Sequence, residues 1–171
     1  VQSLKKIDLT NLKSRTISLQ ISPPDSIQLF GVSIEENTGL YVDNLAVRGN
    51  SGIALSRISR SMLRESHRLR PYNLMVLQFG LNVVSEDDSI QYTGYVQSMT
   101  RVINQFKEGF PGCSILVISV SDRSSNQGGT FKTIPVILTM REAQSVIAQK
   151  SAVAFWDMFA AMGGENSMPK F

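Results

Sequence analysis

The residue best placed for chemistry in this 171-residue sequence is Asn82, which follows an apolar run at residues 74–77 through the turn-forming Gly80. A short apolar run of this kind is typical of a strand buried in a parallel sheet. Open α/β sheets bind their ligands at the carboxyl ends of such strands. The side-chain amide of Asn is an uncharged donor, so it can stabilise a developing oxyanion without changing its own charge. The alternative is that Gly80 and Asn82 only form the turn that leads into the next helix.

The other candidate reactive groups favour structural interpretations. The single Cys, Cys113, and the single His, His67, exclude an internal disulfide and a structural zinc site. Cys113 begins an apolar run and is interpreted as a small core residue, whereas His67 is interpreted as a surface or edge residue of a helix. Adjacent acids at 35–36 and 87–88 are typical of solvated turns or helix starts.

Composition narrows the classes of partner. With 42% hydrophobic and 18% charged residues the chain is typical of a globular domain rather than a disordered one. The net charge of +3 and the lack of basic runs mixed with aromatics argue against nucleic acid as a partner. No apolar run has the length of a membrane span. No phosphate-binding glycine motif is present, so a nucleotide-binding domain is a weak alternative and no cofactor or metal is expected. The first residue is Val and no signal-peptide pattern follows it, which indicates a processed or excerpted piece.

The elements that would position Asn82 alternate between strands and helices. Apolar runs at 74–79, 113–120 and 152–157 predict buried strands, and helical periodicity predicts helices over 55–69, 86–109 and 135–151. Ser85 is the expected N-cap of the second helix, and residues 121–130 are expected to form a polar loop. Period-two alternation before residue 48 predicts antiparallel strands. The predicted fold class is therefore α/β, with a three-layer parallel sheet flanked by helices after a β-rich front.

Two further side-chain patterns each allow two interpretations. Four arginines are displaced from the apolar face of the helix at 55–69: Arg57, Arg60, Arg64 and Arg68. We interpret them as a solvated face, with an anionic partner as the alternative. The single Trp, Trp156, is predicted to be a core residue with Phe155 and Met162 as neighbours, with a sugar-stacking platform as the alternative.

Four short blocks, taken in order, resemble the SGNH (GDSL-like) hydrolases. They are Leu45-Ala46-Val47-Arg48-Gly49, Gln78-Phe79-Gly80-Leu81-Asn82, Val120-Ser121-Asp122-Arg123, and Phe155-Trp156-Asp157 with Ala161-Met162-Gly163-Gly164. The resemblance implies an SGNH/flavodoxin-like core and an oxyanion hole in which Gly49 donates its backbone N–H and Asn82 its side-chain amide. It also implies that both residues lie at the ends of neighbouring parallel strands and face one crevice.

The front of the chain is similar to family members that carry a β-sandwich insertion. This likeness rests on residues 30–35 and on the block Gly39-Leu40-Tyr41-Val42. The expected division is the end of a jelly-roll-like insertion at 1–38 and a partial hydrolase core at 39–171. Such members are similar to peptidoglycan or polysaccharide O-acetyl esterases and are usually exported, which implies a secreted or periplasmic location.

Two blocks of the family pattern are missing from the sequence. The nucleophile block Gly-Asp-Ser and the final Asp-x-x-His are absent, and Ser26, Ser33 and Ser89 lack the context of a nucleophile. The resemblance thus implies a fragment of a metal-independent serine esterase that removes O-acyl, mainly acetyl, groups from a carbohydrate. The Ser, His and Asp would come from missing N- and C-terminal segments, and this chain alone would be inactive. The alternative is a non-catalytic carbohydrate- or partner-binding module on the same scaffold.

Overall fold

The computed structural model describes residues 4–9, 16–22, 28–36, 38–85, 87 and 91–171. The chain forms two compact units, one of residues Lys6–Ala46 and the other of Val47–Phe171 together with the first five residues. The expected division at 38/39 stays a prediction.

The larger unit contains a parallel sheet of three strands in the order β1-β2-β5. These strands are β1 (Leu74–Gln78), β2 (Ser114–Ile118) and β5 (Ala154–Trp156). Met75 pairs with Ile115, and Val117 pairs with Phe155. The prediction of an α/β fold with a parallel sheet is confirmed, because each apolar run between two helices became a strand.

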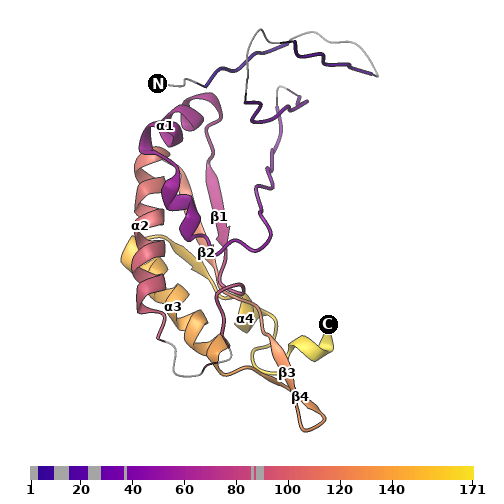
Figure 1. The fold of residues 1–171 in the computed structure, drawn as a ribbon, viewed down its shortest axis with the longest axis vertical. Coiled ribbons are helices and arrows are strands. Elements are labelled where there is room, and N and C mark those ends of the chain that lie inside the picture. Colours follow the sequence, from indigo (N-terminus) through magenta and orange to yellow (C-terminus); the bar gives the residue numbers. More distant parts are fainter. Residues whose placement is uncertain (1–3, 10–15, 23–27, 37, 86, 88–90) are drawn as a thin grey trace. The chain divides into compact units, whose positions relative to one another are not determined.

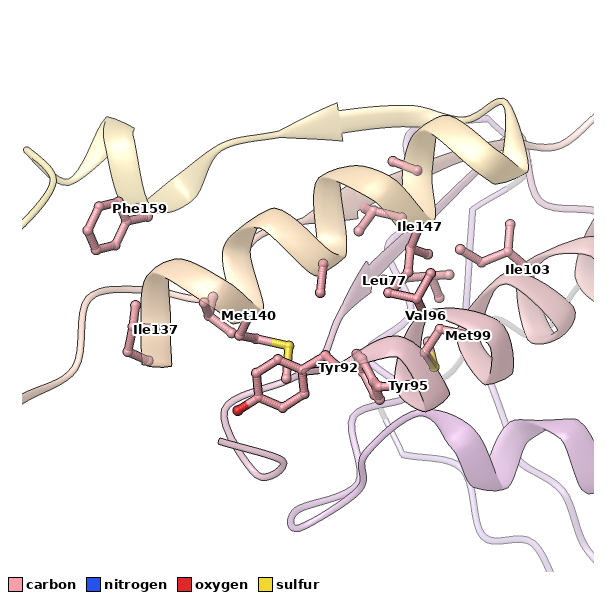
Figure 2. Close-up of a cluster of buried hydrophobic side chains, with 14 of the residues drawn as sticks. Leu77, Tyr92, Tyr95, Val96, Met99, Ile103, Ile137, Met140, Ile147 and Phe159 are labelled. Carbon is pink, nitrogen blue, oxygen red and sulfur yellow. The ribbon is translucent and has the colours of Figure 1, made fainter. Parts of the chain in front are cut away.

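Three helices flank this sheet. They are α1 (Arg60–Leu69), α2 (Thr93–Gly109) and α3 (Val136–Ser151), and α2 packs between the other two (Figure 1). The apolar stripes of α2 and α3 meet residues from one face of the sheet in a common core (Figure 2). Ile103, Ile137 and Met140 are fully buried there. On the other face, Leu74 and Val76 are half-exposed, so a second helical layer there stays a prediction.

Two helix boundaries differ from the predictions. The helix expected over 55–69 is interrupted, with a 3₁₀ helix η1 (Ile53–Arg57) before α1. Ser59 causes the break: it is extended, and its hydroxyl accepts a hydrogen bond of 3.2 Å from the backbone N–H of Met62 as the N-cap of α1. The second helix begins only at Thr93, so Ser85 is not its N-cap. The hydroxyl of Ser85 instead accepts from the N–H of Asp87 in a local turn.

The polar segment expected to be a loop contains an antiparallel hairpin. Strands β3 (Ser124–Gln127) and β4 (Thr130–Thr133) pair around Gly128 and Gly129. Both glycines have positive φ, 63° and 89°, as a two-residue hairpin turn requires. The Gly-Gly pair was the signal for this turn, but the polar strands hid it. The unit ends with α4 (Met158–Ala161) and the 3₁₀ helix η2 (Met168–Lys170).

The antiparallel strands expected in the smaller unit are not confirmed. The described residues of Lys6–Ala46 form no helix or strand. Their apolar side chains are mostly exposed, for example Phe30 at 71% and Leu40 at 92%. Period-two alternation forms a stable sheet only when its apolar face packs against something, and these side chains have little packing within the unit.

The prediction of a buried Trp156 is wrong. Its side chain is 48% exposed, and it does not belong to the core cluster. It lies on β5 at the edge of the sheet, with Phe155 turned toward the core instead. Alternation along β5 places Phe155 and Trp156 on opposite faces, and Phe155 is on the face that packs against the core. Among the described residues, no helix is long and apolar enough to cross a membrane.

Candidate functional site

The turn after β1 is fixed by Gly80. Its φ is 116°, and its carbonyl accepts hydrogen bonds from the N–H groups of Val83 (2.8 Å) and Val84 (3.2 Å). A Cβ added there would lie 2.9 Å from both the side-chain amide nitrogen of Gln144 and a methyl of Val120. Only glycine fits this backbone and this space. The turn therefore brings Asn82 out to the carboxyl end of the strand, where its side chain is exposed.

The segment of residues 49–52 forms a second turn with its own glycines. Gly49 has φ 76° and Gly52 has φ 86°. The side-chain oxygen of Asn50 accepts from the N–H of Gly52 at 2.9 Å, and the hydroxyl of Tyr95 donates to the carbonyl of Ser51 at 3.1 Å. Burial raises the pKa of Tyr95, so this hydroxyl stays protonated and keeps the turn attached to α2.

These two turns meet. The side-chain Nδ2 of Asn82 donates a hydrogen bond of 3.3 Å to the backbone carbonyl of Asn50, the residue after Gly49. We call residues 49–52 and 80–84 the Asn82 corner. Gly49 does not end a strand as expected, because no strand occurs in the described residues 38–52. The two sequence-predicted residues are nevertheless close together, and both are exposed.

The Asn82 corner retains donor capacity. A primary amide carries two N–H bonds, and the contact to Asn50 uses one of them. Within the described residues, the backbone N–H of Gly49 donates to no recorded acceptor. Two uncharged N–H donors on adjacent turns are the kind of arrangement that can bind an oxyanion.

A buried carboxylate lies at the carboxyl end of the neighbouring strand β2. Asp122 is 0% exposed, and it accepts hydrogen bonds from the hydroxyl of Thr133 (2.6 Å), the hydroxyl of Ser124 (3.3 Å) and the N–H of Met168 (2.8 Å). Asn166 completes this group, which we call the Asp122 corner, through two hydrogen bonds with Thr133. The Asp122 corner joins the β3–β4 hairpin to the loop before η2. Sequence reasoning assigned no role to Asp122, although a polar pair directly after a buried strand was the available signal.

A second carboxylate follows β5. Asp157 accepts from the guanidinium Nε of Arg141 at 3.0 and 2.9 Å and from its Nη2, and it also caps α4 through the N–H of Ala160. The hydrogen bonds from Arg141 lower the pKa of Asp157, and the same hydrogen bonds raise the pKa of Arg141. Both edge carboxylates are thus held by structural partners. Neither is arranged as a free general base.

The remaining candidates are not arranged for catalysis. Cys113 is half-buried and lies outside the core cluster, so its interpretation as a core residue is not confirmed. Burial raises the pKa of the Cys113 thiol, which disfavours the nucleophilic thiolate. His67 packs edge-on against Phe110, which also contacts Tyr72. Because Phe110 and Tyr72 precede the strands β2 and β1, His67 lies toward the edge opposite Asn82. Ser33 is exposed in the smaller unit, and Ser26 and Ser89 lie outside the described residues. Among the described residues, no group of three His, Cys, Asp or Glu could hold a metal ion.

Comparison with known proteins gives one informative result. No family model and no curated protein matches the sequence. A solved structure described as a peptidoglycan O-acetylesterase in action matches with a TM-score of 0.60 and 20% identity. This chain has an esterase-like fold. The match covers 71% of this chain and 35% of the esterase chain, so the common part is about a third of that protein. At this identity the likeness concerns the fold alone.

Proposed function

We propose that this chain is part of an SGNH-type serine esterase that removes O-acyl groups, mainly acetyl groups, from a carbohydrate such as peptidoglycan. The observation that carries the proposal is the hydrogen bond between Asn82 and the residue after Gly49, at the carboxyl end of β1. It brings together the two donors that the SGNH resemblance requires. The fold common to this chain and a peptidoglycan O-acetylesterase supports the same reaction class.

The chemistry divides between this chain and segments outside it. A serine hydroxyl attacks the ester carbonyl while a histidine takes its proton, and the carbonyl oxygen becomes an oxyanion. The N–H of Gly49 and the second N–H of Asn82 stabilise that oxyanion. The sugar oxygen leaves with the proton from histidine, and water then releases the acyl group from serine. No metal or cofactor takes part, and export to the cell exterior or periplasm would place the enzyme with such substrates.

Steady-state hydrolysis of an activated acetate ester by the whole protein tests the proposal. Asn82→Ala should lower kcat about 10²–10³-fold, because one oxyanion donor acts mainly on the transition state. Asn73→Ala is the matched control, since Asn73 is an exposed Asn before the amino end of β1. It should leave kcat unchanged. An active protein indifferent to Asn82→Ala would refute the role of the Asn82 corner.

The 171-residue chain by itself should not hydrolyse the ester above background, because its sequence lacks the Gly-Asp-Ser and Asp-x-x-His blocks. Turnover by this chain that Ser33→Ala abolishes would show that the nucleophile was misassigned. The alternative function is a non-catalytic carbohydrate- or partner-binding module. It is favoured by the full engagement of both edge carboxylates, Asp122 and Asp157, in structural hydrogen bonds. A whole protein that binds acetylated glycan without turnover would establish it.

A further inference from the structure

A groove with a volume of about 470 Å³ lies along α2, apart from the Asn82 corner. One wall is the junction between η1 and α1, and the other is the polar face of α2, which lies beside that junction (Figure 1). Gln97, Arg101, Asn104 and Glu108 follow helical spacing along α2 and line the groove. The opposite face of α2 is the one buried in the core.

The groove has fixed walls. The side-chain amide of Gln105 donates to the carbonyl of Ile58, which attaches the η1–α1 junction to α2. Arg60 forms an ion pair of 3.0 Å with Glu108 across the groove. These two contacts hold the walls at a defined separation, so the space between them belongs to the folded unit.

The groove carries unpaired positive charge. Three of the lining side chains are arginines, Arg57, Arg60 and Arg101, and Glu108 is the one acid among them. Because Glu108 is paired with Arg60, Arg57 and Arg101 keep their charge without a carboxylate partner among the described residues. A guanidinium presents several N–H donors in a plane, which suits the two oxygens of a carboxylate.

We propose that this groove binds an acidic polysaccharide, with Arg57 and Arg101 holding its carboxylates. The amides of Gln97 and Asn104 provide both donors and acceptors for sugar hydroxyls. In the part of the chain that the structure describes, no aromatic side chain lines the groove, so the groove lacks the stacking surface that proteins use for nucleic-acid bases. The net charge of only +3 also disfavours a general phosphate-polymer surface.

The experiment measures binding of an oligogalacturonate to the whole protein by calorimetry, with a neutral galactose oligomer of equal length as the comparison. Arg57→Gln combined with Arg101→Gln should weaken binding of the acidic oligomer about tenfold or more. The matched control is Arg64→Gln combined with Arg68→Gln, which removes the same charge from exposed arginines of α1 outside the groove. It should change affinity less than about threefold. Affinity should also fall as salt is raised, because exposed charges are screened.

Three outcomes would overturn the proposal. They are no binding of oligogalacturonate, equal weakening by the two arginine pairs, and tighter binding of a DNA oligomer of the same charge. The second would show diffuse attraction, and the third a nucleic-acid surface instead. The test is independent of the proposed esterase function, because it measures binding without turnover and leaves Gly49 and Asn82 unchanged.

Discussion

The Asn82 corner and the Asp122 corner lie at the carboxyl ends of neighbouring strands but are built in opposite ways. In the Asn82 corner a single exposed hydrogen bond of 3.3 Å joins two turns, and glycines set the backbone. In the Asp122 corner a fully buried carboxylate accepts three hydrogen bonds between 2.6 and 3.3 Å. One corner keeps donors free, whereas the other uses its polar groups internally.

This difference separates function from stability along one edge. A donor can act on a substrate only if the fold has not already used it, as is the case for the second N–H of Asn82. A buried carboxylate stabilises the fold only when its acceptor sites are filled, as they are at Asp122. We therefore expect substitutions at the Asn82 corner to affect turnover and those at the Asp122 corner to affect the free energy of unfolding.

The largest effect on stability is expected from Asp122→Ala. It leaves the hydroxyl of Thr133 and the N–H of Met168 without their acceptor, and each unsatisfied group costs about 1–3 kcal/mol. The two groups together cost about 2–6 kcal/mol. The melting temperature should therefore fall by about 4–24 °C, since 1 kcal/mol corresponds to roughly 2–4 °C in a chain of this size. Calorimetry measures this shift.

Asp8→Ala is the control for that measurement. Asp8 is also an acid, but it forms an ion pair with Lys6 in which both side chains are mostly exposed. An exposed pair contributes less than about 1 kcal/mol, so the melting temperature should hardly change. Equal shifts for the two variants would mean that the Asp122 corner contributes no more than a surface charge.

The sequence was sufficient for the part of the fold that packing determines. The apolar runs at 74–79 and 113–120 predicted β1 and β2, and helical periodicity predicted α3 within one residue of its ends. Periodicity reports burial directly, so it located the elements that carry the core. Periodicity failed where one or two residues set the local backbone conformation. Ser59 interrupts the first predicted helix through its capping hydrogen bond, and Gly128-Gly129 form the turn of the hairpin.

The candidate site was predicted less completely than the fold. Asn82 could be located because a glycine turn after a buried strand marks the carboxyl end of a sheet. The partner of its amide, the carbonyl of Asn50, could not be predicted, because it is a backbone group on a segment without regular structure. The role of Asp122 was also missed, since three of its contacts come from residues up to 46 positions away.

The next largest loss of stability is expected from substitutions of the glycines in the Asn82 corner. Gly52→Ala combines a positive φ of 86° with a Cβ placed 2.9 Å from atoms of Met99 and 3.0 Å from the ring of Phe79. We expect a loss of about 2–3 kcal/mol, from backbone strain together with displaced core atoms. Gly49→Ala has a φ of 76° but nothing within 4 Å of its Cβ, so strain alone should cost about 1–2 kcal/mol. Urea unfolding compares the two, and a Gly49→Ala protein less stable than Gly52→Ala would contradict this account.

The smallest expected effect concerns the pH dependence of stability. It tests whether Asp157, like the Asp122 corner, stabilises the fold. Hydrogen bonds from Arg141 lower the pKa of Asp157 below its ordinary value of 3.8. A carboxyl whose pKa is lower in the folded state stabilises the protein above its unfolded pKa, and this contribution disappears as pH falls through the folded pKa. Asp157→Asn keeps an acceptor for the N–H of Ala160, so it removes mainly the charge interaction with Arg141.

We expect Asp157→Asn to lower the free energy of unfolding by about 1 kcal/mol at pH 7, a modest value because the side chain of Arg141 is 39% exposed. The difference from the unsubstituted protein should shrink below about pH 4, where protonation of Asp157 removes the same charge. Denaturant unfolding at pH 7, 4 and 2.5 measures it. A difference that stays constant over this range would show that the variant acts through the cap or through packing, and that the ion pair does not stabilise the fold.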